Sequence, residues 1–114
     1  MAGSDSNAMD GALTKLGNGS FRLRGRLDLD CAGRVLVAGR KLMRGDGDVF
    51  IDLQQADCAN TAGLALLVEW SMWCAAQGRT LHYRHAADKL LALIAVNGVG
   101  ELLHLPAAQG RRFL

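Results

Sequence analysis

The order of strand-like and helix-like segments is the feature of this sequence that most limits its fold. Residues 49–53, VFIDL, form a short apolar run that is typical of a strand inside a sheet. A helical pattern follows over residues 61–76 and is closed by Gly78, and a second strand is predicted at residues 80–84. The pattern of residues 87–96 predicts a further helix. Because strands joined through helices pair in parallel with right-handed crossovers, the chain is expected to adopt an α/β fold.

The amino-terminal half adds two strands and one helix to this scheme. Residues 12–16 and 21–29 are predicted strands, and the glycine-rich turn at residues 17–19 allows them to pair antiparallel. Asp30 can cap a helix over residues 31–43. The sequence therefore predicts a mixed β-sheet of about four to five strands covered by α-helices.

The composition fits one domain and gives little reason to expect a nucleic-acid partner. The chain has 114 residues, enough for a single core, and a formal net charge of +2 with acids and bases intermixed. Cys31, Cys58 and Cys74 lie far apart and fit no zinc-binding spacing, which predicts free thiols in a reducing cytoplasm and no metal site. No uncharged apolar run reaches the roughly 18 residues of a membrane span, so membrane contact is expected only through a partner.

The two ends of the chain stand apart from the predicted domain. Residues 1–10 are expected to be disordered, and residues 6–8 (Ser-Asn-Ala), directly before Met9, are similar to a cloning scar. This places one domain over residues 11–114. Near its end, residues 101–105 form a short element whose pattern does not decide between helix and strand.

The start of the helix predicted at residues 61–76 is the main candidate site. Asn60 or Thr61 can accept a hydrogen bond from a free backbone N–H group, which would stabilise the helix by about 1 kcal/mol. Capping does not explain Gly63, because glycine inside a helix costs about 1 kcal/mol relative to alanine. Gly63 would permit close packing, or the approach of another backbone or a phosphate. A hydroxyl at a helix start also favours phosphorylation, since the helix dipole stabilises the added negative charge.

The middle of this helix carries more apolar surface than one contact with a sheet requires. One face holds four apolar residues at helical spacing: Leu64, Leu67, Val68 and Ala75. Leu66, Trp70 and Trp73 point to another side. Either this second set is exposed and binds a partner, or one or both tryptophans fold back onto a neighbouring helix.

Two carboxylates near the helix start are candidates for a supporting role. Asp52 lies at a strand end and Asp57 lies in the loop predicted at residues 54–60. Acid–base catalysis needs convergent groups, which these two positions do not guarantee. Asp52 is expected to bind backbone N–H groups of the loop instead.

The remaining polar patterns point to no catalytic centre. The alternation of Arg22, Arg24 and Arg26 indicates a solvated strand face or, as the alternative, a phosphate-binding stripe. His82 and His85 fall on opposite sides of the predicted strand and are poor joint metal ligands. The sequence contains no P-loop, no dinucleotide-binding motif and no recognisable nucleophile–base set, so no cofactor is expected.

Residues 49–67, VFIDLQQADCANTAGLALL, resemble the core of STAS domains, the family of anti-sigma factor antagonists. In that family a strand ends in Asp-Leu, a loop follows, and a helix opens with Asp-Ser-Ser-Gly-Leu. Residues 52–53 match the strand end and residues 60–64, NTAGL, match the helix start without a gap. The first Ser of that family motif is the phosphorylated switch, and Thr61 stands at its position.

Residues 61–67, TAGLALL, are most similar to one branch of the family, the small cytoplasmic STAS subunit of the Mla phospholipid-transport ABC complex of Gram-negative bacteria. There the Thr of a Thr-Ala-Gly-Leu motif is functionally important, and the domain docks on the ATPase subunit. The resemblance implies a non-enzymatic subunit that regulates this ATPase, lies at the inner membrane through the complex, and helps to maintain outer-membrane lipid asymmetry. Asn60, where the branch usually has Asp, and Ala62, in place of the second Ser, depart from the patterns. The residues expected at the contact are Asn60, Thr61, Gly63, Leu66, Trp70 and Trp73.

Two alternatives remain open at this point. The chain could act as an anti-sigma factor antagonist whose Thr61 is phosphorylated by a partner kinase. It could also be a small-molecule sensor or enzyme that works at residues 54–60, although no nucleophile, base or metal set is visible there.

Overall fold

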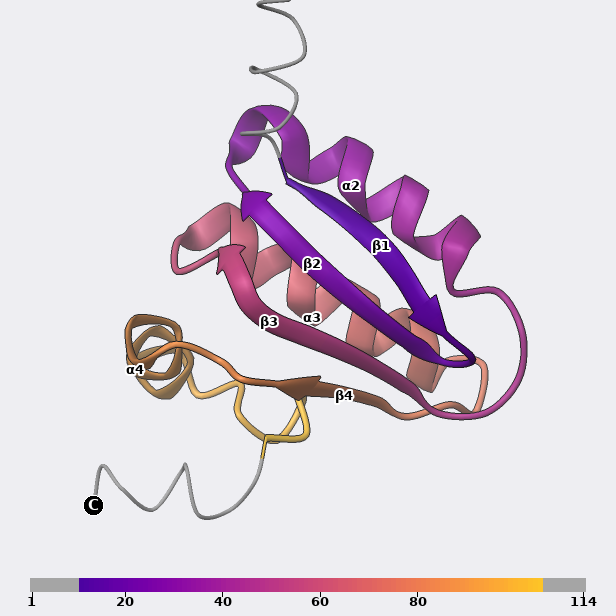
Figure 1. Cartoon of the computed structure of the whole chain (residues 1–114). Coiled ribbons are helices and arrows are strands. Elements are labelled where there is room, and N and C mark those ends of the chain that lie inside the picture. Colours follow the sequence, from indigo (N-terminus) through magenta and orange to yellow (C-terminus); the bar gives the residue numbers. More distant parts are fainter. Residues whose placement is uncertain (1–10, 106–114) are drawn as a thin grey trace, which may run out of the picture.

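Four strands form one mixed sheet in the computed structural model, which describes residues 11–105 (Figure 1). Across the sheet the strands are β1 (Ala12–Gly17), β2 (Ser20–Arg26), β3 (Val49–Asp57) and β4 (Leu81–Arg84). β1 pairs antiparallel with β2, whereas β3 pairs parallel with both of its neighbours. The α/β fold and the mixed sheet predicted from the sequence are confirmed, with four strands.

The helices of the described chain leave one face of the sheet uncovered. They are α2 (Leu29–Leu42), α3 (Thr61–Ala75) and α4 (Asp88–Asn97). α2 and α3 lie on the same side of the sheet, while α4 lies at its margin, beyond the end of β4 (Figure 1). No helix among residues 11–105 is long and apolar enough to cross a membrane.

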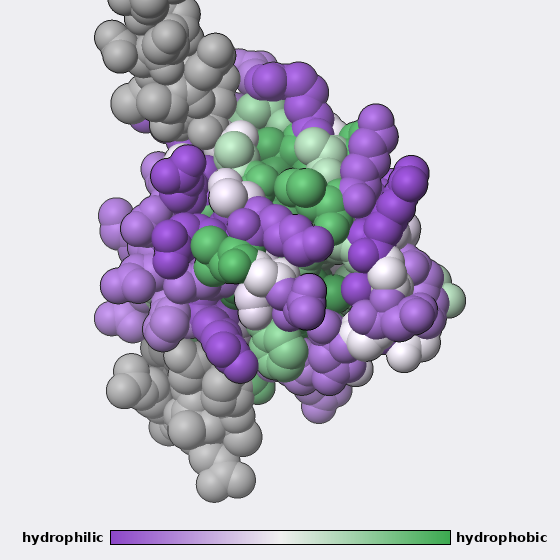
Figure 2. Space-filling model, turned by 45° about the vertical axis from the view of Figure 1, so that its right-hand side comes forward, coloured by the Kyte–Doolittle hydropathy of each residue, from purple (hydrophilic) through white to green (hydrophobic). Residues whose placement is uncertain are grey.

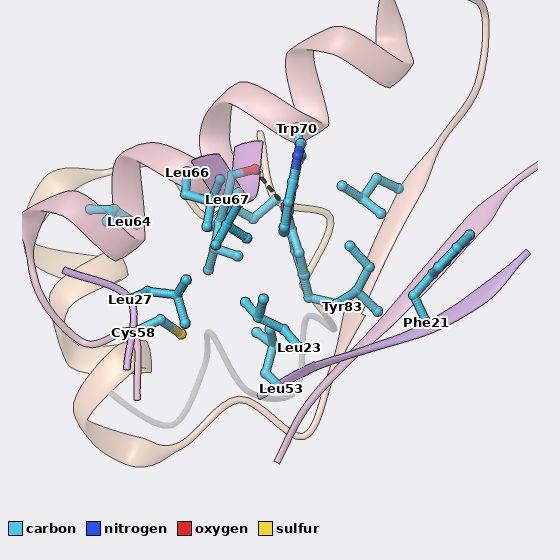
Figure 3. Close-up of a cluster of buried hydrophobic side chains, with 14 of the residues drawn as sticks. Phe21, Leu23, Leu27, Leu53, Cys58, Leu64, Leu66, Leu67, Trp70 and Tyr83 are labelled. Carbon is cyan, nitrogen blue, oxygen red and sulfur yellow. Dashed lines mark hydrogen bonds between the residues drawn. The ribbon is translucent and has the colours of Figure 1, made fainter. Parts of the chain in front are cut away.

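The core fills the space between the sheet and the two covering helices. Over residues 20–23 of β2, residues 49–53 of β3 and the whole of β4, every second side chain is buried, as expected for strands with one covered face. Leu67 and Trp70 of α3 point into the same cluster as Leu23 and Tyr83 (Figure 3). The Tyr83 hydroxyl donates a hydrogen bond of 2.6 Å to the carbonyl oxygen of Leu67. Burial raises the pKa of this phenol well above its ordinary value, so it stays protonated and fixes α3 on the sheet.

A buried arginine joins the end of α2 to the chain that follows α3. Arg79 donates hydrogen bonds to the carbonyl oxygens of Met43, at 2.7 Å, and Gly47, at 2.8 Å. Carbonyl groups at a helix end lack intrahelical partners, and a cation there is favourable. This contact fixes the turn that leads from α2 into β3.

The boundary between β2 and α2 differs from the prediction. The strand expected to reach residue 29 ends at Arg26, directly after Gly25, which has a φ of +84°. The helix then starts two residues early, and its cap is Asp28 rather than Asp30. Asp28 is extended, and its carboxylate accepts hydrogen bonds from the backbone N–H groups of Asp30 and Cys31 at 3.1 and 3.2 Å.

The loop predicted at residues 54–60 is also partly wrong, because β3 continues to Asp57. Residues 55–57 pair with residues 24–26 of β2, so the long partner strand carries β3 beyond its apolar run. The uncertain element at residues 101–105 consists of turns up to residue 104. Residues 1–10, with the predicted disorder and cloning scar, lie outside the described residues.

Candidate functional site

α3 begins with a side-chain cap, and Asn60 provides it. Asn60 is extended, and its Oδ1 atom accepts a hydrogen bond of 2.8 Å from the backbone N–H of Gly63. Of the two capping residues considered from the sequence, Asn60 therefore has this role. Thr61 becomes the first helical residue, and its side chain is exposed to solvent. Its hydroxyl is available at the positive end of the helix dipole.

Gly63 is required for packing within the chain. A Cβ atom built on Gly63 would lie 2.4 Å from the carbonyl oxygen of Cys58, closer than real contacts allow. Gly63 itself is buried. Of the roles considered for Gly63, the structure therefore supports close packing, because the backbone of Cys58 in the turn that leads into α3 already occupies this space.

Leu66 and Trp70 were expected on a docking surface, and the structure places both in the core. Their relative exposures are 3% and 0%. The Trp70 indole N–H donates a 3.1 Å hydrogen bond to the carbonyl oxygen of Leu36 in α2. A Cβ atom at Gly39 would lie 2.4 Å from the Trp70 ring, so the missing side chain at Gly39 makes room for the indole. The surplus apolar face of α3 is thus covered by α2, as the fold-back alternative states.

Trp73 differs from Trp70 in its surroundings. It is half-buried at the edge of the core, and its carbonyl oxygen accepts a 3.0 Å hydrogen bond from the Gln77 amide. It lies twelve residues after Thr61, which corresponds to about 18 Å along a helix. Trp73 and Thr61 therefore do not share one compact patch.

A shallow groove lies between α2 and α3, next to Thr61. The pocket in this groove has a volume of about 330 Å³, and its walls are mostly apolar. It is lined by Leu29, Ala32, Gly33, Leu36, Ala62, Ala65, Leu66 and Glu69, which we call the α2–α3 groove. At one end of the groove, Leu29 is 86% exposed. At the other end, the Glu69 carboxylate lies 3.7 Å from the Arg40 guanidinium group.

The alternation of residues 21–29 predicts a strand that includes Leu29, and this hides the groove from sequence reasoning. The available signal was the spacing of small residues. Ala62 and Ala65 are three apart on α3, and Ala32 and Gly33 face them from α2. Residues three and four apart share a helix face, so this pattern predicts a shallow surface at the helix contact.

The two candidate carboxylates do not meet. Asp52 and Asp57 are five residues apart on β3, a separation of about 16 Å in a strand. Asp52 accepts hydrogen bonds from the backbone N–H of Gln54, at 2.8 Å, and from Nδ1 of His85, at 3.2 Å. Burial alone would raise the Asp52 pKa, but the hydrogen bonds from Gln54 and His85 and the charges of His85 and Arg22 lower it overall. This is the backbone-binding role expected for Asp52, although it lies away from the start of α3.

The space beside the end of β3 is too small for the sensor or enzyme alternative. The pocket lined by Leu53, Asp57 and Cys58, with residues of α4, has a volume of about 80 Å³. Ligand pockets commonly have volumes of about 300–1,000 Å³. Burial, with the neighbouring Asp57 carboxylate, raises the pKa of the Cys58 thiol to about 11, so it is a poor nucleophile at neutral pH. Among residues 11–105, no group of three or more His, Cys, Asp or Glu side chains could hold a metal ion.

A comparison with known families fits this fold and the start of α3. A family model described as "Mlab, STAS domain" matches residues 14–105, from β1 to the turns after α4. The chain belongs to the STAS domain family. This STAS domain has no match among the curated proteins. The family assignment agrees with the resemblance seen at residues 49–67 and covers the strands and helices described above.

Proposed function

We propose that this STAS domain is a non-catalytic accessory subunit that binds and regulates the ATPase of an Mla-type phospholipid-transport ABC transporter. The observation that carries the proposal is the exposed Thr61 at the capped start of α3, in a chain that belongs to the STAS family. The description of the matching family model and the Thr-Ala-Gly-Leu sequence at residues 61–64 favour the transporter branch. In this proposal the domain acts in the cytoplasm and reaches the inner membrane through the complex.

The proposed docking surface combines Thr61 with the α2–α3 groove. Small side chains such as Ala65 and Gly33 permit the close approach of a partner helix, for which interaxial distances are about 8–10 Å. The first N–H groups of α3, at Thr61 and Ala62, have no intrahelical partner and can donate to a carbonyl or carboxylate of the ATPase. Leu29 supplies a protruding apolar side chain beside them.

Regulation requires that this surface distinguish between states of the ATPase. A ligand shifts a conformational equilibrium only by its difference in affinity for the two states. In our proposal the domain binds the assembled, active state more tightly and thereby favours it. No catalytic group of the STAS domain is needed for this effect.

A binding experiment with the purified ATPase subunit tests the proposal. Thr61→Glu adds a charge and bulk at the start of α3, and Ala65→Glu fills the groove, so both are expected to weaken binding at least about tenfold. Val96→Glu is the matched control, because Val96 is 85% exposed on α4, away from the groove. Unchanged affinity of both surface variants in calorimetric titration would contradict the proposal. Trp73→Ala tests separately whether the contact extends along α3.

The second candidate function is an anti-sigma factor antagonist switched by phosphorylation. Its support is the same exposed hydroxyl, which stands at the phosphoacceptor position of the family motif and is not used as the cap. Incubation with the kinase of a candidate anti-sigma system, followed by mass spectrometry, tests it. A phosphate on Thr61 that abolishes partner binding would favour the switch over the transporter role.

A further inference from the structure

The sheet has one face that no helix covers, and this face carries a cluster of arginines. Because both crossover helices lie behind the sheet, the side chains that alternate with the buried ones point to the open side (Figure 1). We call this the open sheet face and define it by Arg22, Arg24, Phe50, Asp52, His82 and Arg84. Figure 2 views the molecule obliquely from this side, where hydrophilic side chains surround and cross a hydrophobic area in the upper middle of the view.

The strand register places these charges close together. Arg22 of β2 pairs with Asp52 of β3, which pairs with Arg84 of β4, so the three residues form a row across the sheet. The two arginines flank β3 and are therefore about 10 Å apart at the backbone, twice the spacing of neighbouring strands. Arg24 continues the basic edge along β2. The six residues of the face carry three guanidinium groups and one carboxylate. At its margins Arg26 pairs with Asp57 in the same register, and Asp48 contacts His82, which adds one guanidinium group and two carboxylates.

Asp52 does not neutralise the arginines of this row by direct pairing. Oδ1 of Asp52 is used by the backbone N–H of Gln54 and by His85. Within the described part of the chain, Arg22, Arg24 and Arg84 form no salt bridge with any carboxylate. Their N–H donors consequently remain available to groups outside the domain.

An aromatic group holds one of these arginines in place. The Arg84 guanidinium carbon lies 4.5 Å from the centroid of the Phe50 ring, and the Phe50 and His82 rings stack with centroids 4.7 Å apart. His82 also contacts Asp48 at 3.2 Å through Nε2. A guanidinium that lies over an aromatic ring loses less freedom when it binds a carboxylate in its plane. Phe50 thus supports Arg84 on the solvent side of the sheet.

We infer that the open sheet face binds an acidic protein segment, rich in Asp or Glu, through bidentate contacts from Arg22, Arg24 and Arg84. Planar guanidinium groups match carboxylates in geometry as well as in charge. The inference does not depend on the proposed function. Because the α2–α3 groove lies on the opposite side of the molecule, the two surfaces can be occupied at the same time.

The same residues fit a membrane or a nucleic acid less well. Attraction to an anionic membrane is worth about 1 kcal/mol per basic residue, so a face whose net charge, with Arg26, Asp57 and Asp48 at its margins, is near +1 gains only about 1 kcal/mol. Phe50 lies under Arg84 and is not free to insert into lipid. Stacking of a nucleic-acid base would also need an uncovered aromatic ring, and the Phe50 ring already carries Arg84.

The test measures binding of fluorescein-labelled deca-glutamate by fluorescence anisotropy at about 50 mM salt, where screening is weak. Arg22→Glu/Arg24→Glu should reduce the affinity at least about tenfold, whereas Lys41→Glu/Lys89→Glu, with the same change in net charge, should stay within about twofold. Lys41 and Lys89 are exposed on α2 and α4. Circular dichroism confirms that each variant is folded.

A conservative variant keeps the inference falsifiable if the double reversal fails to fold. Arg22→Lys/Arg24→Lys retains the charge but removes the planar fork, and an intermediate loss of affinity is expected. Equal losses in the two charge-reversal pairs would overturn the inference, as would an absence of peptide binding. Tighter binding of oligothymidylate, or of vesicles with about 30% phosphatidylglycerol, would also overturn it in favour of those partners.

Discussion

The two halves of α3 look alike in sequence but have opposite surroundings. Around Trp70 the helix is pressed against α2, with the indole over Gly39 and its N–H bonded to the Leu36 carbonyl. Around Thr61 the same two helices leave a groove, because small residues face each other there. A run of apolar residues therefore does not identify a docking surface. The difference comes from the side chains of α3: the Trp70 indole fills the space beside Gly39, whereas Ala62 and Ala65 are too small to fill it at the groove.

The largest effect is expected where the two helices touch. Trp70→Ala removes a fully buried indole and its hydrogen bond, and should lower the free energy of unfolding by about 3–5 kcal/mol. Trp73→Ala, at a half-buried position on the same helix, should cost clearly less. Urea denaturation followed by far-UV circular dichroism measures both. Similar losses would show that the two tryptophans are not in different environments.

A pair of glycine substitutions sharpens the same comparison. Gly63→Ala pushes a methyl group into the Cys58 carbonyl and should destabilise the domain by about 1–3 kcal/mol. Gly33→Ala has no heavy atom within 4 Å of the new Cβ and should stabilise α2 by about 0.5–1 kcal/mol. The critical result is that the two substitutions change the free energy of unfolding in opposite directions, as measured by chemical denaturation. A stabilising Gly63→Ala would contradict the packing role.

The cap of α3 gives a smaller effect at the open end of the helix. Asn60→Ala removes the acceptor for the Gly63 N–H and should cost about 1 kcal/mol. Asn60→Asp keeps an acceptor and adds charge at the positive helix end, so it should retain or slightly raise stability. Thermal unfolding of the three proteins in parallel checks this order. If Asn60→Ala unfolds at the wild-type temperature, the cap makes no net contribution.

The smallest effect concerns the carboxylate of Asp52 on the sheet. Folding lowers the pKa of this carboxyl group below its ordinary value of 3.8, so the ionised form stabilises the folded state. This contribution is fully present at pH values above 3.8. This contribution disappears as the pH falls through the lower folded-state pKa. Asp52→Asn should therefore lower the free energy of unfolding at pH 7, and the difference from wild type should shrink towards pH 3. The change is small because the carboxylate is partly exposed. A difference that does not depend on pH would exclude the ionic origin.

Several features of this protein follow from the sequence alone. The apolar run at residues 49–53 indicates a strand, and the capping residue Asn60 before a long, largely apolar segment indicates the helix at residues 61–75, because both patterns are local. The Asn60 cap is equally local, since donor and acceptor are three residues apart. The motif at residues 60–64 also indicated the STAS family, which the match over residues 14–105 supports.

Only the tertiary structure decided which of these residues are exposed. Leu66, Trp70 and Gly63 looked available because their partners, in α2 and at Cys58, are brought to them only by folding. The end of β3 depended on pairing with β2, and Leu29 became a surface residue when the chain turned into α2. Periodicity shows which side chains share a face, whereas burial depends on what another segment places against that face. The sequence therefore determined the elements and the start of the site, and packing determined the surface around Thr61.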